Sequence, residues 1–197
     1  VKNKPIRLKD GTVLAPASLE GGVWDAFVDI SEDDCETWEK SEFVPLRRAD
    51  YNTQMLHRPY DKHYIFGKGV IQPTLWQDDE GDVHMLLRST SSRIIRSDSK
   101  DGGRTWCTAY DTGIPNNNSG IDLTRMKDGT LILVYNPREN LPNYYKGPRT
   151  PLTVALSEDN GEHFEELCVL EDAQGHFSYP SVICNDKGEI MITYTWN

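Results

Sequence analysis

Residues 97–106, SDSKDGGRTW, bring two carboxylates, three hydroxyls, two glycines and a tryptophan together in ten positions. Such a group could bind a cation or transfer protons. A calcium loop, however, carries carboxylates at several alternating positions and a distant bidentate glutamate, whereas this segment offers only Asp98 and Asp101. Aspartate and serine side chains can bind the N–H groups of a tight loop, and glycine accepts a positive φ. We therefore predict a structural turn here.

A second set of polar side chains stands where apolar runs end. Four turn glycines, Gly11, Gly81, Gly129 and Gly188, are each followed by an apolar, β-rich run. The seventh and ninth residues counted from each glycine are Ser18, Arg88, Asn136, Thr195, and Glu20, Thr90, Arg138, Asn197. Strands commonly end in polar residues, so a structural explanation stands beside a functional one, in which these side chains line a pocket.

The elements that must position these side chains repeat along the chain. Each turn glycine with its flanks is typical of a β-hairpin. Three of the hairpins are followed by related segments: 31–38 (SEDDCETW), 99–106 (SKDGGRTW) and 157–164 (SEDNGEHF). Further strand-like segments surround them, at 24–30 and 42–46 for the first copy and at 152–156 and 166–170 for the third. Every unit is therefore expected to contain four antiparallel strands.

Repeated four-stranded units without a helix are typical of a β-propeller. We predict an all-β chain with blades at about 1–46, 70–111 and 120–170 and a half blade at 177–197. Propellers need about four to eight blades to close their ring. We therefore expect a partial propeller, completed by further blades of a longer polypeptide or by another chain.

The pattern Ser-x-Asp-x-Gly-x-Thr-Trp resembles the Asp-box, or bacterial neuraminidase repeat, and the chain resembles the sialidase superfamily of six-bladed propellers. The second copy matches fully, while the first has Cys35 at the glycine position and the third has His163 and Phe164 in place of Thr-Trp. The resemblance is more specific for fold than for reaction, because one fold hosts many functions.

The predicted fold locates the site away from the boxes. In a propeller, the loops that lead into the innermost strands and those that join strands two and three open on one face. The Asp-box turns lie towards the other. The innermost strands are expected to start at Lys4-Pro5, Gln72-Pro73, Asp122 and Tyr179-Pro180. Proline is tolerated at the first residue of a strand, so this pattern also has a purely geometric explanation.

Several of these residues suit a site for an acidic sugar. Glycosidic cleavage generally uses two carboxyl groups or a substitute such as tyrosine. The catalytic candidates are Glu20, Asp122 and Tyr179. The candidates for binding an anionic sugar and its hydroxyls are Lys4, Arg88, Arg138, Gln72 and Asn136.

The resemblance implies a sialidase site with three arginines on the substrate carboxylate, a Tyr–Glu nucleophile and an acidic aspartate. This sequence departs from that pattern, because Lys4-Pro5 stands where an Arg-x-Pro segment is expected and the blades show no unambiguous arginine triad. Lysine lacks the bidentate fork that suits a carboxylate. The departure puts sialic acid as substrate in question.

Two long segments without strand character, 47–68 and 136–151, are expected on the site face, since long loops in compact domains are usually functional. Their aromatic side chains could stack on sugar rings. The spacing of His57 and His63 does not match a metal-ligand pattern, and no cofactor is predicted.

Composition narrows the choice of partners. A formal charge of −10 and a pI near 4.9 argue against binding to nucleic acid or to an anionic membrane surface. No apolar run is long enough to span a membrane, and no signal-peptide pattern is visible in residues 1–20. The four widely spaced cysteines predict free, packed thiols and favour a reducing compartment.

The leading hypothesis is a sialidase-like glycoside hydrolase, or a related carbohydrate-active enzyme, that acts on an acidic or decorated glycan. Two alternatives remain open. One is a non-catalytic propeller that binds a glycan or a protein, and the other is a polysaccharide lyase in which tyrosine and histidine replace the carboxylates.

Overall fold

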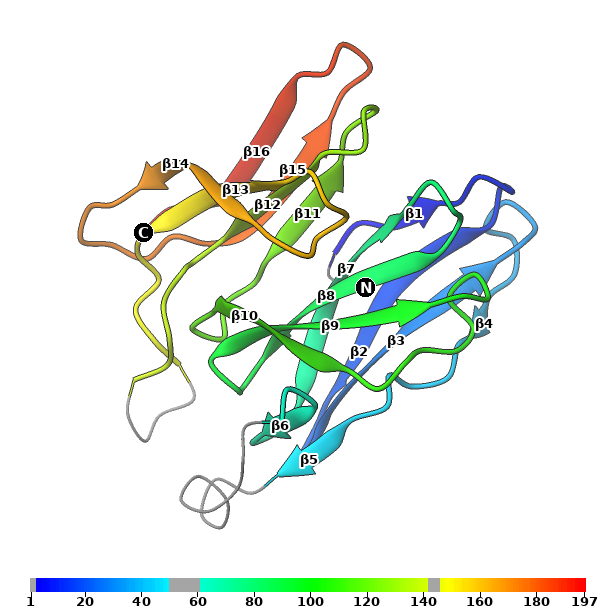
Figure 1. The fold of residues 1–197 in the computed structure, drawn as a ribbon, viewed down its shortest axis with the longest axis horizontal. Helices are drawn as coiled ribbons and strands as arrows, with labels where there is room; N and C mark the ends of the chain where they lie inside the picture. Colours follow the sequence, from blue (N-terminus) through cyan, green and yellow to red (C-terminus); the bar gives the residue numbers. More distant parts are fainter. Residues whose placement is uncertain (1–2, 50–60, 142–145) are drawn as a thin grey trace.

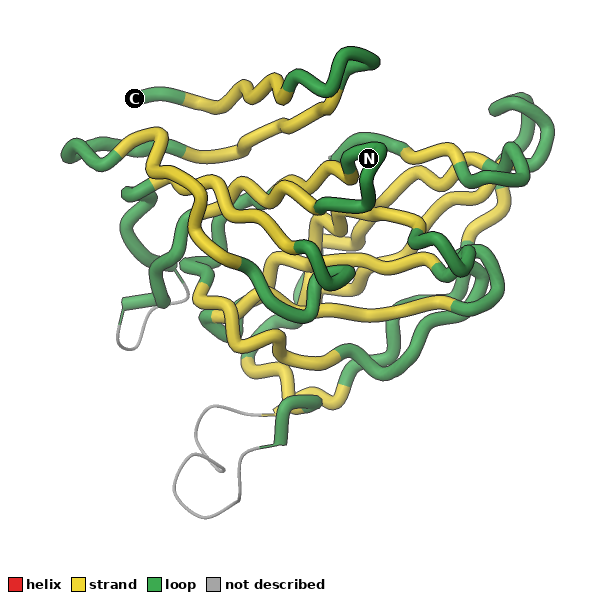
Figure 2. The backbone as a smooth tube through the Cα atoms, turned by 45° about the horizontal axis from the view of Figure 1, so that its top comes forward, coloured by secondary structure: helices red, strands yellow, loops and turns green. Residues whose placement is uncertain are grey.

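A computed structural model describes residues 3–49, 61–141 and 146–197. Within these ranges the regular elements are β-strands joined by loops (Figures 1 and 2). Four aromatic residues of the two long segments, Tyr51, Tyr60, Tyr144 and Tyr145, lie outside the described ranges, as does His57. No helix in the described part of the chain has the length and apolarity needed to cross a membrane.

The strands form three four-stranded antiparallel sheets and a hairpin, in chain order. The first sheet contains β1 (Ile6–Arg7), β2 (Val13–Glu20), β3 (Trp24–Ser31) and β4 (Glu39–Lys40). The second contains β7 (Val70–Gln77), β8 (Val83–Ser89), β9 (Arg93–Ser99) and β10 (Tyr110–Pro115). The third contains β11 (Asp122–Arg125), β12 (Leu131–Tyr135), β13 (Leu152–Ser157) and β14 (Glu165–Glu171). The hairpin is β15 (Ser178–Cys184) with β16 (Ile190–Thr195). These sheets are propeller blades, and we number them 1 to 4.

Short strands β5 (Arg47–Ala49) and β6 (Tyr64–Phe66) form a separate parallel pair. This pair corrects the prediction that residues 47–68 lack strands. The strand predicted at 42–46 is also wrong. The outer strand β4 ends at Lys40, but its ladder continues irregularly, because Ser41 N–H and Val44 N–H still donate to the carbonyls of Val28 and Ala26.

Apolar side chains fill the spaces between successive blades. One cluster joins blades 1 and 2 through residues such as Leu14, Met85 and Leu87, and a second joins blades 2 and 3 through residues such as Leu86 and Leu133. A third cluster lies between blades 3 and 4. Because side chains alternate along β8, its continuous apolar run packs on both neighbouring blades. The sheets therefore stack face to face (Figure 1).

The Asp-box turns have the structural role that the sequence predicts. In the second copy, the Asp101 carboxylate accepts hydrogen bonds from Ser99 Oγ at 2.7 Å, Thr105 N at 2.9 Å and Thr105 Oγ1 at 2.6 Å. Ser99 Oγ in turn accepts from Gly103 N at 2.8 Å. The carboxylate is thus used to hold the turn closed.

The glycine of the box also lets two blades touch. Gly103 has φ +87°, and a Cβ there would lie 2.9 Å from Leu14 Cδ1 of blade 1. Gly161 of the third box, with φ +81°, packs in the same way on Trp76 of blade 2. Cys35, at the matching position of the first box, also has a positive φ of 74° and is exposed.

All four cysteines are free, but the prediction that they are packed is wrong for three of them. Cys35, Cys107 and Cys168 are exposed, and Cys184 is partly buried.

Candidate active site

Two β-bulges aim side chains at one place near the propeller axis. The pairing of β7 with β8 shifts between Ile71 and Thr74, and that of β15 with β16 shifts between Ser178 and Ser181. Each shift contains an X-Pro pair whose first residue has positive φ: Gln72 at 54° and Tyr179 at 51°. Such a backbone is unfavourable for large side chains, and outside tight turns it marks a candidate functional site.

Blade 3 has a glycine at the corresponding position. A Cβ on Gly120 would lie 3.1 Å from Tyr179 Cδ1 and 3.7 Å from Gln72 Oε1. The absence of a side chain therefore lets Tyr179 approach Gln72 across blade 3.

The Arg88 guanidinium lies beneath these residues. Arg88 is only 5% exposed, and its Nε donates to Asn118 Oδ1 at 2.8 Å while its Nη1 donates to Gln72 Oε1 at 3.1 Å. Asn118 itself has φ 58° and is fully buried in the Asn-rich segment before β11. Two neutral amide oxygens thus fix the orientation of a buried cation. Burial lowers the pKa of Arg88, but an arginine remains charged.

The Tyr179 hydroxyl interacts with two arginines. The charges of Arg149 and Arg88 both act on it, and the Arg149 Cζ lies 5.1 Å from the centre of its ring. Partial burial opposes ionisation, but the two nearby guanidinium groups prevail and lower the pKa of Tyr179. Because Tyr179 is 52% exposed, this polarised phenol is accessible to a ligand.

Glu20 lies close enough for its charge to act on Arg88. It is exposed at the end of β2 and accepts a hydrogen bond from Ser18 Oγ at 3.4 Å, while Ser18 Oγ also receives the Gln72 N–H at 3.5 Å. The structure therefore brings together four of the predicted residues: Gln72, Arg88, Tyr179 and Glu20.

Lys4 and Asp122 lie one step further along the inner strands. Lys4 Nζ contacts Asp122 Oδ2 at 2.7 Å, Thr74 Oγ1 donates to Asp122 Oδ1 at 2.9 Å, and Val182 N donates to Oδ2 at 2.9 Å. Asp122 is 2% exposed. Its carboxylate thus ties the inner segments of all four blades together. A catalytic role for Asp122 stays a prediction, but this bonding argues for a structural one.

Asn136 and Arg138 are not part of the cluster formed by Arg88 and Tyr179. Asn136 is fully buried, its Nδ2 donating to the carbonyls of Pro151 and Phe177 and its Oδ1 accepting from Ser119 Oγ. Arg138 is exposed, and its Nε makes a 3.4 Å bond to the carbonyl of Thr150. Their roles as substrate ligands stay predictions.

Sequence reasoning missed Asn118 and Arg149. The run of residues 116–120, NNNSG, was a usable signal for Asn118, because asparagine and glycine tolerate positive φ and the run occupies the position of the two X-Pro bulges. Nothing in the sequence distinguishes Arg149 from Arg138.

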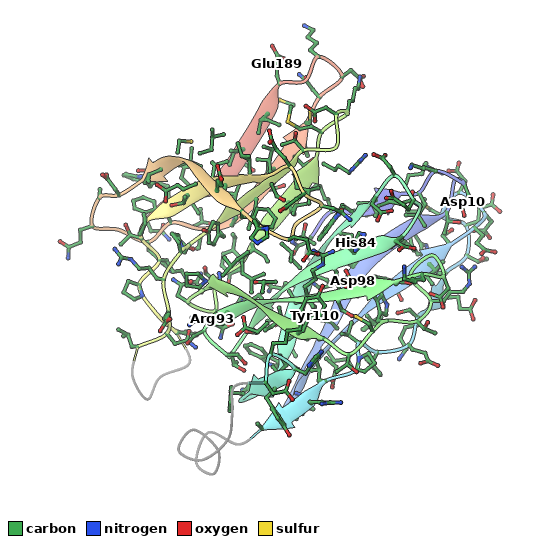
Figure 3. All side chains as sticks on the ribbon, viewed as in Figure 1. Asp10, His84, Arg93, Asp98, Tyr110 and Glu189 are labelled. Carbon is green, nitrogen blue, oxygen red and sulfur yellow. The ribbon has the colours of Figure 1, made fainter. Side chains whose placement is uncertain are left out.

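A second polar cluster lies between blades 2 and 3, away from this site. Arg96 Nε donates to Asp98 Oδ1 at 2.9 Å, and Tyr110 donates to the same carboxylate at 2.9 Å. His84 stands between two carboxylates, with Nδ1 2.6 Å from Asp98 and Nε2 2.8 Å from Asp78. Figure 3 shows His84, Asp98 and Tyr110 close to one another. Although burial opposes the shift, Asp98 raises the pKa of Arg96.

The third Asp-box completes that cluster from blade 3. Trp76 stacks on His84 with ring centres 4.9 Å apart and donates to Asn160 Oδ1 at 2.7 Å. Within this cluster Arg96 is paired with Asp98 and also with Glu162 of blade 3, at 3.1 Å, so the cluster is suited to joining blades. Within the described ranges, no group of three His, Cys, Asp or Glu side chains is arranged to hold a metal ion.

Comparisons with solved structures show a sialidase-type propeller. A Dyadobacter fermentans protein of unknown function is 18% identical with TM-score 0.71, covering 99% of this chain and 49% of that one. The NanB sialidase of Streptococcus pneumoniae is 18% identical with TM-score 0.65, covering 96% and 26%. The Trypanosoma rangeli sialidase is 14% identical with TM-score 0.65, covering 96% and 28%.

The chain thus spans about half the length of the first of these proteins and little more than a quarter of the sialidases. No curated protein matches it. The model of the BNR repeat-like domain matches residues 1–192, which include all three Asp-boxes and every strand except the last three residues of β16. The chain therefore belongs to the BNR repeat-like domain family, with a sialidase-like β-propeller fold.

Proposed function

We propose that this chain carries the acid-binding part of the active site of a carbohydrate-active enzyme that cleaves a glycan containing an acidic sugar. The observation that carries the proposal is the half-exposed Tyr179 side chain, on whose hydroxyl the charges of Arg88 and Arg149 both act and whose ring centre lies 5.1 Å from the Arg149 Cζ. Guanidinium groups bind carboxylates through paired N–H donors. A carboxylate held there lies beside a polarised phenol, which can act as a nucleophile or as a base.

The fold supports the same class of substrate, because the solved relatives named above include sialidases. A sialidase-like hydrolysis would use Tyr179 as the attacking group and Glu20 as its partner. Asp122 is left out of the proposal, since its oxygen atoms bond Lys4, Thr74 and Val182.

The test is to incubate the purified protein with acidic and with neutral glycans and to measure cleavage by the release of reducing ends. We expect cleavage of acidic glycans alone. Arg149→Ala should lower kcat/KM by at least about 100-fold, as expected when a charged contact to the reacting group is lost. Arg104→Ala is the matched control, because Arg104 pairs with Glu32 in an exposed box turn and its loss should leave the rate unchanged. Equal loss in both variants would contradict the assignment.

A non-catalytic glycan-binding propeller is the second candidate. It is favoured by one observation: among the described residues around Arg88 and Tyr179, Glu20 is the carboxylate found at the site. Tight binding of an acidic glycan without release of reducing ends would support this candidate and exclude the enzyme.

A further inference from the structure

The site brings one particular atom of an acidic sugar, the carbon that bears its carboxylate, close to Tyr179. The Arg149 Cζ lies 5.1 Å from the centre of the Tyr179 ring, Gln72 holds Arg88 on the other side of Gly120 from that ring, and the charges of both arginines act on the Tyr179 hydroxyl. A carboxylate bound by the same two groups therefore lies next to the phenol oxygen. The carbon that bears the carboxylate is then the nearest carbon of the sugar. The chemistry at that carbon depends on the class of sugar acid.

In a hexuronate this carbon is C5, and it carries a hydrogen. Cations on the carboxylate acidify that hydrogen, because they stabilise the negative charge that develops when it leaves. In a sugar acid whose carboxylate is on the anomeric carbon, the same carbon has no hydrogen. Cleavage then needs attack on carbon and a separate acid for the leaving oxygen.

The described groups suit proton abstraction better than the second route. Asp122 is bonded to Lys4, Thr74 and Val182, and Glu20 is an exposed side chain at the rim. The side chain beside the two cations is a phenol, whose lowered pKa increases the fraction present as phenolate at a given pH. Gln72 and Asn118 fix the guanidinium of Arg88 in place for this task.

Building on the function proposed above, we propose that the substrate is a 4-linked hexuronate polymer and that Tyr179 breaks its chain by β-elimination. The Tyr179 phenolate takes the C5 proton, and the C5–H electron pair becomes a C4=C5 double bond. The C4–O4 bond breaks with its electrons on O4. The new phenol then gives its proton to O4, which restores the phenolate, and no water is consumed.

The experiment uses the purified protein with polygalacturonate, polymannuronate and a 4-linked glucuronan as probes, and carboxyl-reduced polygalacturonate as the matched control. Two signals are recorded together: reducing ends, and the ultraviolet absorbance of a double bond conjugated with a carboxylate. We expect at least one uronate polymer to give both signals in equal molar amounts and the reduced polymer to give neither.

Tyr179→Phe should retain binding of the cleaved polymer and lower the rate of double-bond formation by at least about 100-fold, the contribution typical of a positioned base. Deuterium at C5 should slow the reaction of the unchanged protein. Cleavage of a uronate or other acidic glycan without the absorbance would overturn elimination while leaving the proposed function intact. Failure to cleave any acidic glycan would overturn both.

Discussion

Strands β8 and β9 each carry a buried arginine, and the two arginines have opposite surroundings. Arg96 donates to the Asp98 carboxylate beside His84, and the pKa of Arg96 is raised. Arg88 donates to the neutral amide oxygens of Asn118 and Gln72, and burial lowers the pKa of Arg88. A cation bonded to a carboxylate is already neutralised. One oriented by amides and open to a half-exposed phenol can still accept an anion from a ligand.

This difference in hydrogen-bond partners distinguishes a cluster that joins blades from a site that binds a ligand. A buried charge is tolerated when it is paired. Arg96 meets this condition within its own cluster, because it is paired with Asp98 and Glu162. The Arg88 cluster is better completed by an acidic ligand, and this requirement is the physical basis of the proposed function.

Replacing each arginine by methionine should have opposite effects on stability and on cleavage. Arg96→Met leaves the Asp98 carboxylate without its guanidinium partner and should lower the free energy of unfolding by about 3 kcal/mol. Arg88→Met leaves two amide oxygens without a donor and should cost only about 1–2 kcal/mol, but it should reduce kcat/KM at least about 100-fold. Urea unfolding and glycan-cleavage rates measure the two effects.

The opposite result would end the distinction. It would consist of Arg96→Met losing cleavage while keeping its stability, or of Arg88→Met unfolding the protein more than Arg96→Met does.

A second prediction concerns the box glycines that let blades touch. Gly103→Ala forces a positive φ on alanine and places Cβ against Leu14, so it should lower the free energy of unfolding by about 2–3 kcal/mol. Gly11→Ala is the matched control, because Gly11 also has positive φ but a Cβ there would meet no atom within 4 Å; its cost should be about 1 kcal/mol. Equal costs in urea unfolding would show that contact between blades contributes nothing here.

A third prediction concerns Gly120, which lets Tyr179 approach Gln72 and Arg88. Gly120→Ala adds a methyl group 3.1 Å from Tyr179 Cδ1, so the tyrosine must shift relative to Arg88. Misplacing a reacting group by a fraction of an ångström is costly, and we expect kcat to fall about tenfold with little change in unfolding. An unchanged kcat would mean that the placement of Tyr179 is not important for cleavage.

The smallest expected effect is a pH dependence in the third Asp-box. The Asp159 carboxylate raises the pKa of His163 above 6.5, so this pair should stabilise the fold fully below pH 6.5 and lose its contribution as pH rises through the higher folded value. His163→Thr restores the residue found in the other two boxes, where Asp33 and Asp101 bond threonine. In thermal unfolding, the stability of the unchanged protein should decline slightly between pH 6 and 8, and the variant should not show this decline. The same decline in the variant would contradict the pairing of His163 with Asp159.

At low pH the sign reverses. Although slight burial opposes it, hydrogen bonds from His163 and Ser157 lower the pKa of Asp159 to about 2. Its contribution to stability is therefore present above the ordinary value of 3.8 and is lost as pH falls towards 2.

The sequence by itself determined the repeat and the position of each box turn, and it indicated the ends of the apolar runs as the place of a site. These features depend on local signals: a turn glycine, an alternating apolar run, and a carboxylate two residues after a serine. They therefore identified Gln72, Arg88, Tyr179 and Glu20 as residues of interest. The same alignment grouped Lys4 and Asp122 with them, because it did not account for the bulges at Gln72-Pro73 and Tyr179-Pro180.

Only the tertiary structure decided which of these residues meet. Two bulges move Gln72 and Tyr179 relative to their strands, whereas Lys4 and Asp122 pair one step away. Asn118 reaches Arg88, and Arg149 reaches Tyr179, each from a loop that is 30 residues away in the sequence. Such contacts depend on how the blades stack. A charged side chain can bind a ligand only where its neighbours in space do not already neutralise it.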